Sequence, residues 1–355
     1  MSDEILHEAR RQIGICNACR YCEGYCSVFP AIFLKPDIGD GEILNLANLC
    51  HNCRDCYYAC QYIEPHEFAL NLPKILAGLR QKSWRDHAWP AAFAGVFHKN
   101  AMAVAGALIA GFALLFSLAA VLHPGSGTGF YAVMPHGAMV GLFLPAAGFA
   151  LFSIAVSLRR YWRHIGGGRI RGRDLLFALR MAGTMRDLSG GHGAGCNYED
   201  TDRFTNARRW FHQAAMYGFG LCFAATSAGA FLHYGLDLNA PYGLLSLPKL
   251  PGVPGGVMLC AGALGLGWLK LKADHNLGAA EVWNGEMAFV VLLFTVSFTG
   301  LALAACPAAL AVWLLPVHLG AVLTLFLLAP YTKMIHGFYR FAALMHHARR
   351  QASAS

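Results

Sequence analysis

The sequence predicts a mainly α-helical membrane protein, in which a cysteine-rich N-terminal head precedes a six-helix transmembrane bundle. Three observations support this fold class. Of the 355 residues, 56% are hydrophobic and only 14% are charged, whereas soluble domains carry about 25% charged residues. Eight of the 12 cysteines fall within the first 60 residues. Beyond residue 100, apolar segments appear that are long enough to cross a bilayer.

The apolar segments define six expected membrane spans, because a transmembrane helix requires about 20 predominantly apolar residues. The expected spans are residues 101–122, 134–158, 211–234, 253–271, 287–306 and 310–332. They lack Asp, Glu, Lys and Arg except near their ends, where Lys270 closes the fourth span. We therefore expect a membrane domain at residues 101–338 and a short tail at 339–355.

The distribution of positive charge predicts the orientation of this bundle. Of the 28 Lys and Arg residues, all but Lys249 lie in four blocks that alternate with uncharged connections. These blocks are residues 1–100, 159–209, 270–272 and 333–350. This positive-inside pattern accounts for the net charge of +8 without a nucleic-acid partner. Because residues 1–12 are polar and show no signal peptide, we expect a multi-pass protein of the bacterial inner membrane with both termini in the cytoplasm.

Two copies of one cysteine motif carry the strongest chemical signal. Cys16, Cys19, Cys22 and Cys26 follow the spacing C-x2-C-x2-C-x3-C, and Cys50, Cys53, Cys56 and Cys60 repeat it. In two-cluster ferredoxins with this spacing, the fourth cysteine of each motif ligates the other [4Fe–4S] cluster. We therefore predict a ferredoxin-like domain at residues 1–66. Its first cluster is held by Cys16, Cys19, Cys22 and Cys60, and its second by Cys50, Cys53, Cys56 and Cys26.

The alternative of zinc is weaker, since zinc sites take two ligands from each of two well-separated C-x2-C units. One departure is that Ser27 and Gln61 stand where a proline usually follows the fourth cysteine. The remaining cysteines are interpreted as apolar residues of the spans (Cys222, Cys260 and Cys306). Cys196 lies near His192 in a glycine-rich stretch, and a turn is favoured there over a metal site.

Two connecting segments are expected at the membrane surface. Residues 67–100 form a linker whose first part, residues 67–89, combines Trp84 and Trp89 with basic side chains. This mixture is typical of an interfacial helix that joins a soluble head to a bilayer. Residues 188–197 are too rich in glycine for a helix and are expected to form a loop.

Four histidines are expected to hold b-type haem. His212 and His233 lie at the two ends of the third span, and His318 and His336 lie near the ends of the sixth. On antiparallel helices, His212 is level with His336 on the inner side, and His233 with His318 on the outer side. The 18 residues from His318 to His336 are about five helical turns, so both rings should leave one face. Each pair can supply two axial ligands, for one or two haems. The alternative is that these are ordinary polar residues at helix ends.

The motifs resemble those of the tricarballylate/citrate utilisation protein B family, often called TcuB or CitB. The segments that carry this resemblance are residues 16–31, 50–68, 208–212 and 330–337. The membrane half also resembles the haem-bearing gamma subunit of respiratory nitrate reductases, which supports the assignment of His318 and His336. The resemblance implies a partner, a cytoplasmic FAD-dependent dehydrogenase that oxidises tricarballylate and is reoxidised by this protein.

We therefore expect an electron-transfer protein that passes electrons from this flavoprotein, through two clusters and haem, to membrane quinone. We find no nucleophile–base set, Walker loop or dinucleotide fingerprint, so no catalytic residues of its own are assigned. The alternative is a membrane-bound ferredoxin without haem, acting as a redox sensor or in metal-centre assembly. Detection of b-type haem discriminates between the two.

Overall fold

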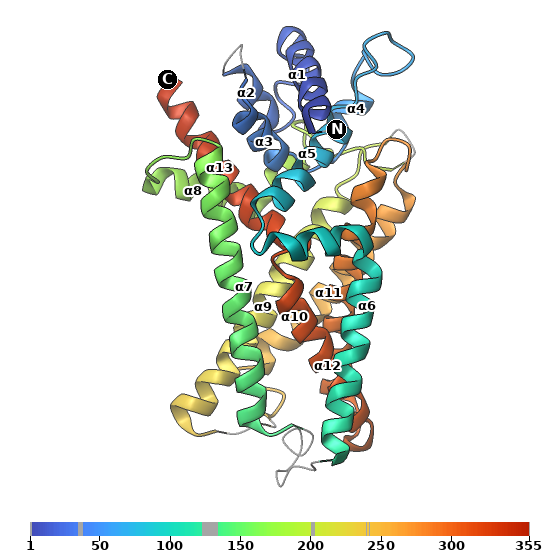
Figure 1. Cartoon of the computed structure of the whole chain (residues 1–355), viewed down its shortest axis with the longest axis vertical. Helices are drawn as coiled ribbons and strands as arrows, with labels where there is room; N and C mark the ends of the chain where they lie inside the picture. Colours follow the sequence, from blue (N-terminus) through green and yellow to red (C-terminus); the bar gives the residue numbers. More distant parts are fainter. Residues whose placement is uncertain are drawn as a thin grey trace.

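The computed structural model describes residues 2–34, 38–122, 134–199, 203–238, 240 and 242–354. The described chain forms two stacked parts, a head and a bundle of long helices, and both chain ends lie at the head end (Figure 1). The expected mainly helical fold is confirmed. The uncharged connection 123–133 lies outside the described residues.

The head is built around the two cysteine motifs. Its helices are α1 (Ser2–Cys19), α2 (Val28–Phe33), α3 (Asp40–Leu49), α4 (Asp55–Tyr58) and α5 (Leu72–His87). Ile32, Ile43 and Leu79 are fully buried in one apolar core, which also takes in Leu344 from the C-terminal helix. The two ends of the chain therefore share a core, and the head cannot lose that helix without exposing apolar surface.

Helix α5 fills the place expected for an interfacial helix, but protein covers it on most sides. It packs against α1 and α3 of the head and against α6, α7 and α11 of the bundle. Trp84 is only 5% exposed, and its indole N–H donates to Asn48 Oδ1 at 2.9 Å. The tryptophan therefore anchors α5 inside the head, whereas the sequence pattern predicted that it would contact lipid head groups.

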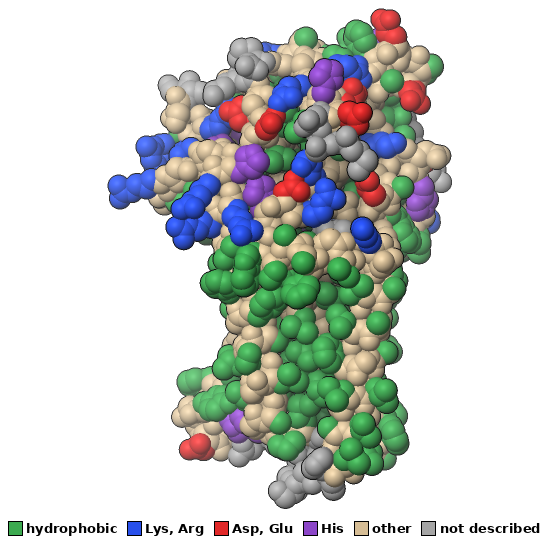
Figure 2. Space-filling view, viewed as in Figure 1, with side chains coloured by type: hydrophobic (Ala, Val, Ile, Leu, Met, Phe, Trp, Pro, Cys, Tyr) green, Lys and Arg blue, Asp and Glu red, His purple; other side chains and the backbone are tan. Residues whose placement is uncertain are grey.

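Six helices are long and apolar enough to cross a membrane, as expected. They belong to α6 (Ala91–Leu122), α7 (His136–His164), α9 (Ala207–Leu236), α10 (Lys249–Lys272), α11 (Ala280–Ala305) and α12 (Ala308–Leu328). Asn100 breaks the helical geometry within α6, and the candidate span of this helix covers Lys99–Leu122. Figure 2 shows the charged side chains gathered on the head and a largely apolar face below it.

Two expected span limits are wrong. Helix α11 begins at Ala280 instead of 287, which places Glu286 inside it. The helix continues because Lys270 and Lys333 pair with this carboxylate inside the protein. Helix α12 ends at Leu328 instead of 332, because Pro330 has no N–H to continue the helical hydrogen bonds.

After a turn the chain resumes as α13 (Ile335–Ala354). His336 is therefore on a different helix from His318, and the argument that both rings share one helical face is wrong. The remaining elements are α8 (Gly172–Thr184) and the short η2 (Arg186–Leu188), and α8 packs on α13.

Helices α9 and α10 form a closely packed hairpin with glycines at their contact. A Cβ added at Gly218 of α9 would lie 2.5 Å from the backbone nitrogen of Leu259, and one at Gly262 would lie 2.5 Å from that of Ala215. Small residues allow membrane helices to approach this closely. This packing fixes the position of α9, which carries His212.

We expect Gly218→Val to destabilise the protein by about 2 kcal/mol, because the new side chain meets backbone that cannot move aside. Gly220→Val is the matched control, since Gly220 is exposed and a Cβ there meets nothing within 4 Å. The measurement is the thermal unfolding midpoint of both variants in detergent. Equal midpoints would show that the close approach is unimportant.

Buried polar contacts fasten the head to the C-terminal helix and the η2 segment. Arg340 of α13 donates to the Leu49 carbonyl and pairs with Asp187 at 2.5 Å. Asp187 Oδ1 also accepts from the backbone and hydroxyl of Ser27, at 3.1 and 2.9 Å. Leu49 and Ser27 adjoin Cys50 and Cys26, so these contacts hold both flanks of the second predicted cluster.

We expect Asp187→Ala to cost about 3 kcal/mol, because it leaves the Arg340 guanidinium buried without its carboxylate. Asp86→Ala is the control, since Asp86 pairs with Lys82 at the exposed surface and such pairs contribute about 0–1 kcal/mol. Thermal unfolding in detergent compares the two. A loss of similar size in both variants would contradict the assigned role of Asp187.

Candidate electron-transfer site

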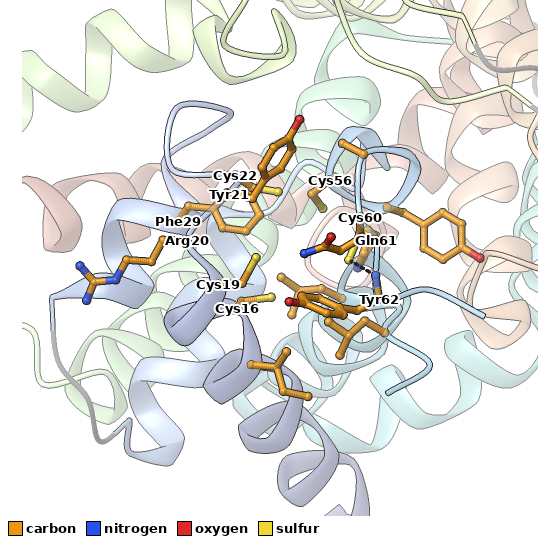
Figure 3. Close-up of a pocket in the computed structure, with 16 residues that line it drawn as sticks. Cys16, Cys19, Arg20, Tyr21, Cys22, Phe29, Cys56, Cys60, Gln61 and Tyr62 are labelled. Carbon is orange, nitrogen blue, oxygen red and sulfur yellow. Dashed lines mark hydrogen bonds between the residues drawn. The ribbon is translucent and has the colours of Figure 1, made fainter. Parts of the chain in front are cut away.

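The structure brings the four cysteines of the first predicted cluster around one cavity. Cys16 and Cys19 end helix α1, Cys22 lies in the following turn, and Cys60 approaches from the second motif (Figure 3). The cavity has a volume of about 280 Å³. Cys19 is exposed, whereas the other three are half-buried. This predicted cluster therefore has an edge at the protein surface.

The four cysteines of the second predicted cluster also meet. Cys50 caps α3, Cys53 and Cys56 flank the start of α4, and Cys26 precedes α2. They line a small pocket. Cys26 of the first motif therefore lies with three cysteines of the second, and Cys60 of the second lies with three cysteines of the first. That iron–sulfur clusters occupy the two places stays a prediction.

The two motifs share local backbone features that suit cluster binding. Arg20 and Arg54 occupy equivalent positions in the two motifs, and both adopt left-handed backbone with φ of 58° and 63°. This conformation turns the chain sharply between two cysteines. Backbone N–H groups donate to sulfur, from Asn52 to Cys50 at 3.3 Å and from Tyr62 to Cys60 at 3.4 Å. Such bonds stabilise thiolate ligands and tune cluster potentials.

Burial makes the free thiols poor acids. It raises the pKa of Cys16 and of Cys22 to about 12, and neighbouring sulfurs add to the effect. The thiolates therefore require cationic iron to form at neutral pH.

A single zinc ion fits the geometry less well. Tetrahedral zinc would hold its sulfurs about 3.8 Å apart, and within the described residues no three Cys, His or acidic side chains converge in this way. In a cubane each thiolate binds a different iron, so the sulfurs can stand farther apart.

Cys196 is a ninth cysteine at this site that the sequence analysis missed. It is 2% exposed, and a hydrogen bond from its thiol to Cys53 lowers the pKa of Cys53. The segment 188–197 is a loop, as expected, and Gly191 there has φ of 77°, with the Gly24 carbonyl 2.2 Å from any added Cβ. Nothing in the spacing of Cys196 indicates this contact, because the loop reaches the cysteine motifs only in the folded chain.

The inner histidines meet as expected in a large cavity at the head end of the bundle. The ring centroids of His212 and His336 are 5.6 Å apart. Two imidazoles that bind one metal ion from opposite sides have centroids about 6 Å apart, given bonds of about 2.0 Å. The cavity has a volume of about 840 Å³ and mostly apolar walls, from α7, α9, α10, α11 and α13. Its size and polarity suit a haem.

The surroundings of this pair fit axial ligation. The Nδ1–H of His336 donates to the Lys333 carbonyl, which leaves Nε2 free to bind a metal. Burial lowers the pKa of His336 well below its usual value, so the ring is neutral. Arg159, Arg208 and Lys270 also line the cavity, where they can neutralise the carboxylates of a porphyrin.

The second cysteine motif touches this cavity directly. His51, next to Cys50, packs edge-on against His212 with centroids 6.2 Å apart. Arg208 of α9 donates to the carbonyls of His51 and Asn52. The predicted second cluster and the predicted inner haem are therefore linked through one contact between side chains.

The outer histidines are not brought together. His233 stacks on His136 of α7, with centroids 4.0 Å apart, while His318 Nδ1 is 2.9 Å from the Thr299 hydroxyl. The expected pairing of His233 with His318 lacks support because α9 packs on α10 and leaves its outer end beside α7. Haem ligation by these two residues stays a prediction.

Comparisons with known proteins show the family to which the chain belongs. Residues 95–355 match the family described as citrate utilization protein B, and residues 9–88 match its Fer4-like domain. The citrate utilization protein B of Escherichia coli is 41% identical over 346 residues, which cover 95% of this chain and 90% of that protein. No solved structure matches the chain. The chain therefore belongs to the citrate utilization protein B family.

Proposed function

We propose that this protein is a membrane electron-transfer protein. It reoxidises a cytoplasmic FAD-dependent dehydrogenase, for which a tricarballylate dehydrogenase is the expected candidate, and delivers the electrons to membrane quinone. Two [4Fe–4S] clusters and b-type haem, when bound, would supply the one-electron chemistry. The proposal places the head and both termini in the cytoplasm, in agreement with the positive-inside rule.

One observation supports this proposal above the others: the ligand sets follow one another from the surface into the bundle. Cys19 is exposed, Cys56 contributes to both cysteine pockets, and His51 joins the second motif to His212. A redox sensor or assembly factor without haem has no need for the last contact. The order of these groups favours transfer from the head to the membrane.

The residues of the chain hold and insulate this path. Arg208 and Arg340 bind backbone carbonyls beside Cys50 and so fix the second motif against the bundle. Tyr21 beside the exposed Cys19 is itself 68% exposed. We place the contact with the flavoprotein on this surface, because the shortest route into the first cluster begins there.

We expect Cys53→Ser to remove about half of the acid-labile sulfide, because one of two clusters loses a thiolate ligand. Cys222→Ser is the control, since Cys222 lies within α9, far along the sequence from both motifs. Iron and sulfide are measured per mole of purified protein. Unchanged sulfide in Cys53→Ser would rule out the ligand assignment.

We expect His336→Ala to abolish binding of the inner haem while iron–sulfur content stays near that of the parent protein. His347→Ala is the matched control, because His347 is a buried histidine on the same helix that faces another pocket. A pyridine-haemochrome spectrum gives the haem content. A parent protein without b-type haem would favour the alternative of a ferredoxin-like sensor or assembly factor.

A further inference from the structure

A second cavity lies between the second cysteine motif and the turn that joins α10 to α11. Its volume is about 270 Å³. Asn52 and Arg54 of the motif form one wall, and Trp283 of α11 lies on another side. Tyr198, Lys270 and Glu286 line both this cavity and the larger one that holds His212. The smaller cavity therefore adjoins the second predicted cluster and the predicted haem together.

Two residues that line this cavity each carry a buried hydrogen-bond donor without a partner. The donors are the Nε–H of Arg54 and the indole N–H of Trp283. Arg54 is only 5% exposed, and its NH1 group is already bound to the Asp274 carbonyl at 2.6 Å. Leaving a buried donor unpaired is costly. The pair therefore indicates a ligand that offers acceptor oxygens and few donors.

The other walls narrow the chemistry of that ligand. Ala77, Ala273 and Val282 supply apolar surface, while Glu286 is shared between Lys270 and Lys333. Together with the Arg54 guanidinium, this leaves an excess of positive charge, which favours an apolar molecule on which negative charge develops during reaction. A planar quinone head group, apolar with two carbonyl oxygens, has these properties.

The position of the cavity agrees with a ligand that arrives from lipid. It lies where α10 ends at Lys272 and α11 begins at Ala280, at the edge of two candidate membrane spans. A quinone dissolved in the bilayer can present its head group at this depth, while its tail stays among lipid chains.

We propose that this cavity binds the quinone head group, with Arg54 and Trp283 as donors to its carbonyl oxygens. The proposal rests on the proposed function for its source of electrons. Quinone takes up two electrons and two protons to become quinol; the reduced flavoprotein supplies the electrons through the iron–sulfur centres, and its flavin is oxidised. The protons come from water at the exposed His275, which lines the cavity.

The test measures binding of menadione to the oxidised full-length protein in detergent, by equilibrium titration. We expect Trp283→Phe to weaken binding about tenfold, the usual effect of losing one hydrogen bond to a buried acceptor. Trp268→Phe is the matched control, because Trp268 lies on the neighbouring helix α10 and is 46% exposed. Arg54→Lys should weaken binding as well, with sulfide content measured to show that the adjacent cluster is intact.

Equal menadione affinity in the parent protein and Trp283→Phe would overturn the proposal, as would binding that inorganic phosphate abolishes by competition. Because the titration uses oxidised protein, its result does not depend on electron transfer. Reduction of the parent protein by dithionite tests the proposed function separately, through bleaching of the iron–sulfur absorbance. If dithionite bleaches the protein but all variants bind menadione with equal affinity, the proposed function stands and only the proposed quinone site is ruled out.

Discussion

The docking of the second cysteine motif on the bundle is the constraint on which the rest of the structure depends. Arg208 from α9 and Arg340 from α13 each donate to backbone carbonyls next to Cys50. Because the acceptors are backbone carbonyls, these bonds hold the main chain of the motif itself in position. That position sets His51 against His212, and without it the cysteine motifs would have no contact with the histidine pair of the bundle.

The sequence predicts the parts of this structure that local chemistry determines. The six spans follow from composition, and the crossed meeting of Cys26 with the second motif follows from the spacing together with the ligand exchange known in two-cluster ferredoxins. Neither composition nor spacing predicts which helices pack against each other. His233 and His318 are level by topology, yet the glycines at the contact of α9 and α10 leave His233 beside His136. Periodicity gives the height of a residue in the membrane and does not tell which helix it faces.

One departure had a visible signal in the sequence, and another did not. Pro330 ends α12 and places His336 on a new helix, although the ring still reaches His212. The hydropathy pattern starts the fifth span after Glu286. In the structure Glu286 lies inside the helix, because it pairs with Lys270 and Lys333, which are distant in sequence. A charged residue that hydropathy places outside a membrane helix can therefore lie within it when oppositely charged side chains pair with it. Those partners are brought close only by tertiary contacts.

The ion pairs around Glu286 suit the head end of the bundle to the proposed redox role. Glu286 is 6% exposed, and it contacts Lys270, Lys333 and Arg80, so positive charge exceeds negative charge there. Buried charges are tolerated only when they are paired. An anionic group on the cavity side would complete the balance, as porphyrin carboxylates or a quinone oxygen gaining charge would do. In the proposed function, the buried cations would stabilise the negative charge that arrives with electrons from the head.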